Sequence, residues 1–316
     1  MKEYNRVEAE RTARDLLGAP RDFVFAMVTD SHLDDNSAET AECIARVDEE
    51  AGFECLMHMG DMLNGGMEWK WSMRLMKEQM ELFRSAVDGG FYPAQGNHDG
   101  YCDSQGGDLI TDEFYREAAD FLLNDPRVTL PGKRPYYYVD FAEKKIRLIV
   151  LSMFDCRRTE KGWAHFQGMD AEQVDWLRDV ALDLDSGWTV MLFSHDAPFM
   201  VYTEEALTAE GKAHSPRALQ AVIDRRAERG FAVPAWFVGH VHGDWMGNIC
   251  GVNVILVGCA SGYVPQLWDM PEGGAFAPRT PGTVSENLWD AAALDMRNRK
   301  IRLFRCGAGE DRVMDY

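Results

Sequence analysis

Five short polar blocks carry the residues of this sequence that are best suited to chemistry. Each block follows an apolar run, and together they hold five of the eight histidines. Carboxylate, amide and imidazole groups without a thiolate suit Mn, Fe, Zn, Mg or Ca rather than a soft metal. In chain order the blocks are Thr29-Asp30-Ser31-His32, Gly60-Asp61, Gly96-Asn97-His98-Asp99, Ser194-His195-Asp196 and Gly239-His240-Val241-His242.

Taken singly, each block also has an ordinary structural explanation. Asp30 fits a cap or turn, Gly60-Asp61 a tight turn and Asn97 an Asx turn, because these residue types favour turns. The occurrence of all five blocks after successive apolar runs favours a metal site over five unrelated turns.

Apolar runs and helical patterns alternate along the chain, as in βαβ units. The carboxyl ends of such strands are where open α/β sheets bind ligands, and the polar blocks follow those ends. The expected strands are 23–28, 55–59, 91–95, 146–151, 189–193, 235–238 and 252–257.

Capping residues mark the expected helices between the strands. Asn36 with Glu39, and Asp170 with Gln173, resemble capping boxes, and Gly52 stops the first of these helices. The dipeptide 215–216, Ser-Pro, is expected to open a further helix that ends at Gly230. Residues 69–83, rich in methionine, have helical spacing and are expected to pack in the core.

The end of the chain has a different pattern, with 289–296 and 300–305 predicting a hairpin that makes the sheet mixed. We expect one domain over residues 1–316, with a motif core at 22–260 and a closing hairpin at 285–316.

The ordered blocks resemble the calcineurin-like metallophosphoesterases. That family has the pattern Asp-x-His, Gly-Asp, Gly-Asn-His-Asp/Glu, a lone His after an apolar strand, and Gly-His-x-His. The matching positions span residues 30–242, about two thirds of the chain. The resemblance implies an α/β fold, a four-layer α/β/β/α sandwich with mixed sheets.

The resemblance also implies a dinuclear centre of two divalent transition-metal ions, Mn, Fe or Zn. Asp61 would bridge both ions, with a hydroxide as the second bridge and the nucleophile. His98 would protonate the leaving oxygen, and Asp99 would orient its ring. The implied ligand sets are Asp30, His32 and His242 for one ion, and Asn97, His195 and His240 for the other.

Charge supports this reading and limits the partners. Lys plus Arg number 33 and Asp plus Glu 52, a net charge of −19 that repels nucleic-acid backbone and anionic lipid. Two divalent ions, less two aspartates and a hydroxide, leave a local charge of about +1 that can hold a phosphate. We therefore expect a small phosphate ester as substrate, no membrane and no nucleic-acid polymer; nothing in the sequence indicates an oligomeric state.

Departures from related subfamilies narrow the class. The run 62–66, Met-Leu-Asn-Gly-Gly, lacks the arginine that protein Ser/Thr phosphatases carry after Gly-Asp, and Asn64 stands where purple acid phosphatases have tyrosine. The sequence favours hydrolysis of a small phosphomonoester or phosphodiester. A nuclease of the same superfamily and a non-catalytic scaffold with this fold are the alternatives; a scaffold would be expected to lose ligands that this chain keeps.

Several further residues have a structural reading. His58 is expected to pack or to make one hydrogen bond, and His214 to lie at the surface. Trp163, His165 and Phe166 are expected in a loop, either as a lip over the substrate or as a packing cluster. Specificity is expected from loops 101–110, 157–170, 200–214 and 264–284.

The compartment is predicted from cysteines and from the absence of targeting patterns. The seven cysteines are dispersed and odd in number, which argues against a disulfide framework and against a thiolate zinc site. No secretory leader or membrane-length apolar run is present, so we expect a cytoplasmic protein.

Overall fold

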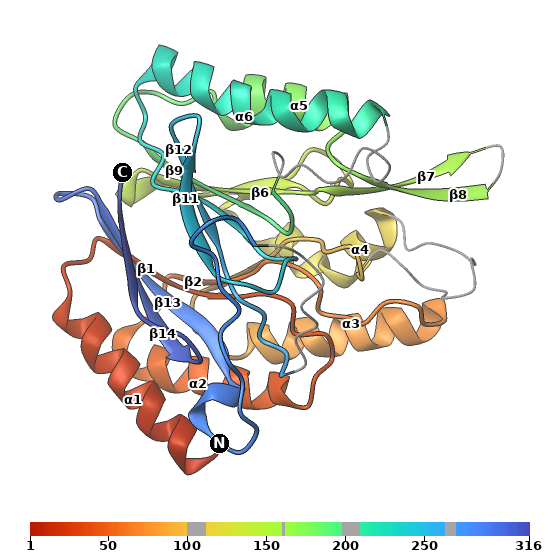
Figure 1. The fold of residues 1–316 in the computed structure, drawn as a ribbon. Helices are drawn as coiled ribbons and strands as arrows, with labels where there is room; N and C mark the ends of the chain where they lie inside the picture. Colours follow the sequence, from red (N-terminus) through yellow and green to blue (C-terminus); the bar gives the residue numbers. More distant parts are fainter. Residues whose placement is uncertain (100–111, 160–161, 198–208, 263–269) are drawn as a thin grey trace.

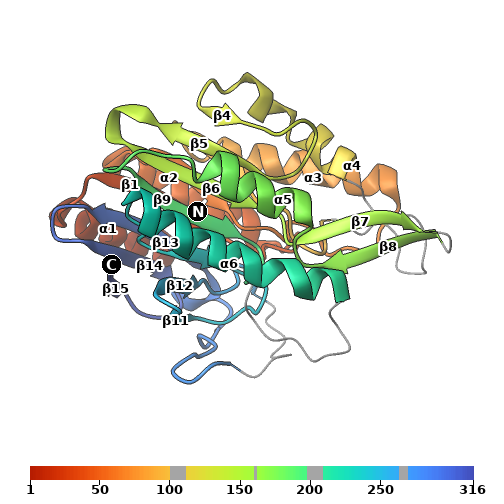
Figure 2. The ribbon, with the colours of Figure 1, turned by 90° about the horizontal axis from the view of Figure 1, so that it is seen from above.

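The computed structural model describes residues 1–99, 112–159, 162–197, 209–262 and 270–316. Two mixed β-sheets face each other, and helices cover the outer face of each sheet (Figure 1). This arrangement confirms the expected α/β fold with four layers. Seen from above, the outer helices α5 (Ala171–Trp176) and α6 (Ala209–Arg229) lie across the second sheet (Figure 2).

The first sheet has six strands in the order β15-β14-β13-β1-β2-β3. Strands β1, β2 and β3 run parallel, while β13 pairs antiparallel with β1. The strands are β1 (Phe23–Val28), β2 (Cys55–His58), β3 (Gly90–Pro93), β13 (Leu288–Asp295), β14 (Lys300–Gly307) and β15 (Arg312–Asp315). The helices on its outer side are α1 (Glu3–Gly18), α2 (Asn36–Ala51) and α3 (Trp69–Arg84).

The second sheet has seven strands in the order β11-β12-β10-β9-β6-β5-β4. Its strands are β4 (Val128–Thr129), β5 (Tyr137–Phe141), β6 (Ile146–Leu151), β9 (Thr189–Ser194), β10 (Trp236–Val238), β11 (Trp245–Ile249) and β12 (Val252–Leu256). The other elements are α4 (Asp112–Ala118), β7 (Phe154–Thr159), β8 (Gly162–Gln167), α5 (Ala171–Trp176) with a π-helical continuation (Leu177–Ala181), α6 (Ala209–Arg229), and short 3-10 helices at Asp120–Asn124, Ala142–Lys144 and Val284–Glu286.

Aromatic side chains fill the space between the two sheets. The ring of Phe25 on β1 lies 5.9 Å from that of Phe193 on β9 and 5.8 Å from that of Phe237 on β10. All three side chains are fully buried, and burying a residue of this size contributes about 1.5 to 3 kcal/mol. This core fixes the two sets of strand ends relative to each other.

The start of α2 differs from the expected capping box. Asn36 is the first helical residue; its backbone N–H donates to Asp34 Oδ1 at 2.9 Å, and its side chain donates to the carbonyl of Glu286. The carboxylate of Asp34 therefore takes the role predicted for Asn36. The end is as expected, because Gly52 has φ +67° and stops the helix.

The second expected capping box is half present. The Asp170 side chain accepts the backbone N–H of Gln173 at 2.7 Å, as predicted. The Gln173 side chain does not return to the cap, however. It bonds both backbone groups of Ser152, at 2.8 Å and 2.7 Å, and so ties α5 to the end of β6.

Helix α6 begins at Ala209, so the prediction that Ser215 opens it was wrong. Pro216 lies inside the helix, where it has no backbone N–H to donate to the preceding turn. The predicted end at Gly230 is confirmed by its φ of +76°.

The C-terminal hairpin is confirmed, and β15 extends it beyond the prediction. The segment with Trp163, His165 and Phe166 is strand β8 rather than a loop, and His214 belongs to α6; their side chains lie outside the described residues. The expected specificity segments 101–110, 200–208 and 264–269 also lie outside them.

Candidate metal centre

All five polar blocks meet where the strands of the two sheets end. Several residues there have left-handed backbone angles, with φ of 54° at Asp30 and at Asp61, 47° at His32, 67° at His240 and 63° at His242. Such angles are uncommon for residues other than glycine and often mark functional sites. Backbone bonds between neighbouring strand ends hold them, such as Asp30 N to Gly60 O at 2.9 Å.

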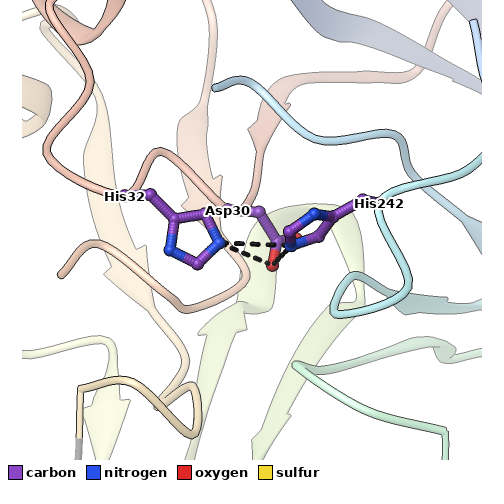
Figure 3. Close-up of side chains that lie close together, drawn as sticks. All are labelled: Asp30, His32 and His242. Carbon is purple, nitrogen blue, oxygen red and sulfur yellow. Dashed lines mark hydrogen bonds and ion pairs between the residues drawn. The ribbon is translucent and has the colours of Figure 1, made fainter. Parts of the chain in front are cut away.

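The first cluster joins the end of β1 to the loop after β10 (Figure 3). Nε2 of His242 lies 3.2 Å from Asp30 Oδ1 and 3.1 Å from Nε2 of His32. Nε2 of His32 lies 3.7 Å from the same carboxylate oxygen. These three atoms therefore face a common point.

The second cluster is centred on His195, whose side chain is fully buried. Its Nε2 lies 3.1 Å from Asp61 Oδ2, 3.2 Å from Asn97 Oδ1 and 3.2 Å from Nδ1 of His240. The end of β9 thus meets the ends of β2 and β3 and the loop after β10.

Asp61 lies between the two clusters. Its Oδ2 is 3.1 Å from His195 in the second cluster and 3.9 Å from His32 in the first. Its Oδ1 accepts the backbone N–H of His98 at 2.8 Å, so the carboxylate is fixed. A single carboxylate in this position can serve both clusters.

Backbone carbonyls orient two of these imidazole rings. Nδ1 of His195 donates to Met59 O at 2.7 Å, and Nδ1 of His32 to Leu63 O at 3.1 Å. Each bond leaves the Nε2 atom facing the cluster. Fixing the ring through its other nitrogen is how proteins orient metal-binding histidines.

The clusters are rich in negative charge that protons offset when no metal ion is bound. Burial opposes the charge on Asp30, but His242 and His195 outweigh it and hold the pKa of this carboxyl well below its usual range. Burial also opposes charge on His242, yet Asp30 raises the pKa of that ring to about 11. Asp61 and Asp30 likewise raise the pKa of His195 to about 10 against its burial. Metal binding replaces such protons.

His32 and His240 differ, because burial lowers the pKa of both rings despite the nearby carboxylates. Both rings are therefore neutral near pH 7, which is the form that binds metal ions.

The residues present fit divalent metal ions. Oδ1 of Asp30 is buried and receives no hydrogen bond of good geometry from the described residues, so this strong acceptor has only the two imidazole rings of the first cluster beside it. With metal bonds near 2.1 Å, two ligands on one ion lie about 3.0 to 3.4 Å apart, and most separations above are of this size. Carboxylate, His and His can converge in three overlapping groups: Asp30, His32 and His242; His32, Asp61 and His98; and Asp61, His195 and His240.

His98 stands at the edge of the centre, with 43% of its side chain exposed. Its Nε2 is 3.9 Å from Asp61 Oδ2, and its Nδ1 bonds Asn64 O at 2.8 Å. The ring is thus oriented by the Asn64 carbonyl, and the expectation that Asp99 orients it is corrected.

Asp99 instead clamps the loop that follows β2. Its Oδ2 accepts the N–H groups of Asp61 and Gly96, at 2.9 and 3.0 Å, and its Oδ1 those of Met62 and Leu63, at 2.9 and 3.1 Å. Burial and the charge on Asp61 raise the pKa of Asp99 to about 6. Its hydrogen-bonding capacity is fully used by the backbone.

Close packing explains the glycine before Asn97. A Cβ on Gly96 would lie 2.2 Å from both the backbone nitrogen and Oδ1 of Asp61. The sequence pattern included the glycine of this block. It did not predict that the backbone carbonyls of Met59, Leu63 and Asn64 orient histidine rings, because every residue type carries a backbone carbonyl and the sequence gives no signal for its role.

His58 is fully buried outside the two clusters, as expected for a structural residue. Its Nε2 bonds Ser31 Oγ at 3.1 Å, and Nδ1 accepts the N–H of Gly60 at 3.3 Å. Burial lowers the pKa of this ring to about 3, so it stays neutral.

Comparison with known families agrees with this geometry. The sequence model of the calcineurin-like phosphoesterases matches residues 23–244, a range that contains all five polar blocks. The chain belongs to the calcineurin-like phosphoesterase family. Membership in this family supports a phosphoesterase hydrolase and implies divalent metal ions. None of the curated proteins matches the sequence.

Solved structures share the fold at low sequence identity. A dimetal phosphatase from Danio rerio is 15% identical with a TM-score of 0.58, covering 94% of this chain and 100% of its own. The inner-membrane-complex anchor GAP50 of Plasmodium is 12% identical with a TM-score of 0.51, covering 89% of this chain and 83% of its own. PhoD is 10% identical with a TM-score of 0.51, covering 94% of this chain and 72% of its own.

Among the described residues, no helix combines the length and the apolar character that a membrane span needs.

Proposed function

We propose that this chain is a dinuclear-metal phosphoesterase that hydrolyses a phosphomonoester or phosphodiester of a small molecule. The observation that carries the proposal is the sharing of Asp61 by two clusters of nitrogen and oxygen atoms. We assign Asp30, His32 and His242 to one ion, Asn97, His195 and His240 to the other, and Asp61 to both.

Two divalent ions in such a centre supply charge for the phosphoryl oxygens and a water-derived nucleophile near neutral pH. The chain's own residues position the metal ligands and protonate the leaving oxygen. Asp61 is held by the N–H of His98, and the carbonyls of Met59 and Leu63 keep two rings aligned. His98 holds a proton at Nε2, the nitrogen not bonded to Asn64, and delivers it to the leaving oxygen.

The acidity of the chain supports a compact substrate. The net charge is −19, so the positive charge of a loaded centre would be local. A small anion reaches such a centre, whereas the flanking phosphates of a long polyanion meet repulsive surroundings. The compartment, predicted as cytoplasmic, stays a prediction.

Metal analysis of the purified protein tests the dinuclear assignment. We expect about two Mn, Fe or Zn ions per chain, and we expect Asp61→Ala to release both because it serves both clusters. Asp140→Ala is the matched control. That carboxylate pairs with Arg147 near the start of β6, away from the strand ends where the two clusters lie. One ion or none after Mn²⁺ loading would refute the assignment.

A substrate comparison at two salt concentrations tests the small-ester proposal. We expect bis-nitrophenyl phosphate and a cyclic nucleotide to be cut faster than a long oligonucleotide, with a difference that shrinks as salt screens repulsion. Faster cleavage of the oligonucleotide at low salt would establish the nuclease alternative instead.

A further inference from the structure

A partly buried ion cluster connects the C-terminal hairpin to the loop that carries two of the proposed ligands. At its centre is Arg305 on β14, with 1% of its side chain exposed. Nε and Nη2 donate to the two carboxylate oxygens of Asp290 at 2.9 and 3.2 Å. Nη1 and Nη2 donate to the two oxygens of Asp244 at 3.0 and 2.7 Å. Two-pronged pairing of this kind fixes orientation as well as distance.

Arg312 on β15 completes the cluster. Its Nη1 donates to Asp244 Oδ1 at 2.8 Å, and its Nη2 donates to Asp290 Oδ2. Two arginines therefore face two aspartates, and the cluster has no net charge. Asp290 lies on β13 opposite Arg305, so three of the four residues belong to the hairpin and the strand that extends it.

Asp244 is the member of the cluster that lies outside the hairpin. It follows His242 by two positions, and its backbone N–H and carbonyl both pair with Ala275, at 2.8 and 2.9 Å. Its Oδ1 also accepts the N–H of Gly258 at 3.2 Å. The segment 240–244 is thus anchored at one end by the Asp244 side chain, which accepts hydrogen bonds from Arg305 and Arg312 of the first sheet.

This segment needs an anchor because its backbone is strained. His240 and His242 have φ of 67° and 63°, and a non-glycine residue in this region costs about 1 to 3 kcal/mol. At the other end, the N–H of His240 donates to Asp30 Oδ2 at 3.0 Å. The two anchors bracket both histidines.

We infer that Arg305 and Arg312 are positioning residues for the metal centre, acting through Asp244 on the segment with His240 and His242. The inference rests on the proposed function. Both arginines lie beyond residue 244, where the match to the family model ends. The closing hairpin then helps to set metal affinity as well as covering a sheet edge.

A stabilising role alone is the competing explanation. The same hairpin offers a matched control, because Arg302 on β14 pairs with Asp295 on β13 at 3.3 Å without touching segment 240–244. Loss of the Arg302–Asp295 pair or of the ion cluster around Asp244 is expected to lower the unfolding temperature. Only loss of the ion cluster around Asp244 is expected to change metal binding.

The test is titration of metal-stripped protein with Mn²⁺, with thermal unfolding measured in parallel. Changing groups that orient metal ligands typically lowers metal affinity 10- to 100-fold. We expect a loss of this size for Asp244→Asn, a smaller loss for Arg312→Met, and wild-type affinity for Arg302→Met. Wild-type Mn²⁺ affinity in Asp244→Asn and Arg312→Met, whatever their unfolding temperatures, would overturn the inference.

Arg312→Met decides the question if Asp244→Asn does not fold, since it leaves both pairs of Arg305 intact. Reduced Mn²⁺ affinity in that variant supports the inference, and unchanged affinity overturns it. A wild-type protein that binds no Mn²⁺ overturns the proposed function and this inference together. Normal wild-type binding with unchanged variants overturns the inference alone.

Discussion

Asp99→Asn is the substitution that most directly tests how the centre is built. The Asp99 carboxylate accepts four backbone N–H groups, two on each oxygen. Asparagine keeps one oxygen, which can accept two of them, and turns an NH₂ group toward the other two. Each buried donor left without an acceptor costs about 1 to 3 kcal/mol. We therefore expect the free energy of unfolding to fall by about 2 to 6 kcal/mol.

Urea unfolding of the metal-free protein measures this loss without a contribution from metal binding. His98→Ala is the control, because that ring is 43% exposed and we expect its removal to cost less than about 1 kcal/mol. In parallel, we expect Asp99→Asn to weaken Mn²⁺ binding, since the loop it clamps carries Asp61 and the carbonyl that orients His32.

Two results would refute this reasoning. One is an Asp99→Asn protein whose unfolding free energy lies within about 0.5 kcal/mol of the wild type, the range of ordinary surface changes. The other is a turnover defect of Asp99→Asn that disappears in a His98→Ala background, because that would mean that Asp99 acts through the ring.

Three further predictions concern other parts of the molecule. We expect His98→Ala to keep its metal content and to lose 10²- to 10⁴-fold in turnover, less with a nitrophenyl leaving group than with an alkyl one; equal losses would exclude His98 as the acid. We expect Gly96→Ala to lose metal in elemental analysis, because its Cβ would lie 2.2 Å from Oδ1 of Asp61; a fully loaded variant would contradict the packing. Burial opposes the charge on Asp290, but its two arginine partners hold the pKa below the usual range, so its contribution is present above about pH 4 and lost below. Unfolding temperature of metal-free protein should fall with pH there, and less steeply in Asp290→Asn.

The apolar runs and the polar blocks of the sequence were sufficient to predict much of the fold. Strand β1 at 23–28 and strand β6 at 146–151 lie where their buried apolar runs predicted them. The hairpin of β13 and β14 was also predicted, because its two runs flank a short polar turn. These features depend on neighbouring residues alone, so local patterns reveal them.

Tertiary contacts decided the features that local patterns mispredicted. Asn36 is of a residue type that favours helix caps, but its side chain donates to the distant carbonyl of Glu286, and the Asp34 carboxylate takes the capping role instead. Asp99 follows His98 in sequence and was therefore expected to serve its ring. The fold turns its carboxylate to the backbone of a different strand end.

The sequence by itself determined which residue types are available to bind metal ions, because the order of the blocks is typical of one family. The resemblance also implied that Asp61 would bridge the two ions. Only the tertiary structure decided that the carbonyls of Met59 and Leu63 orient two of the rings and that Arg305 reaches the loop beyond His242. Such contacts join residues far apart in the chain through the packing of two sheets. No pattern within a single segment encodes them, because their geometry arises only when the sheets meet.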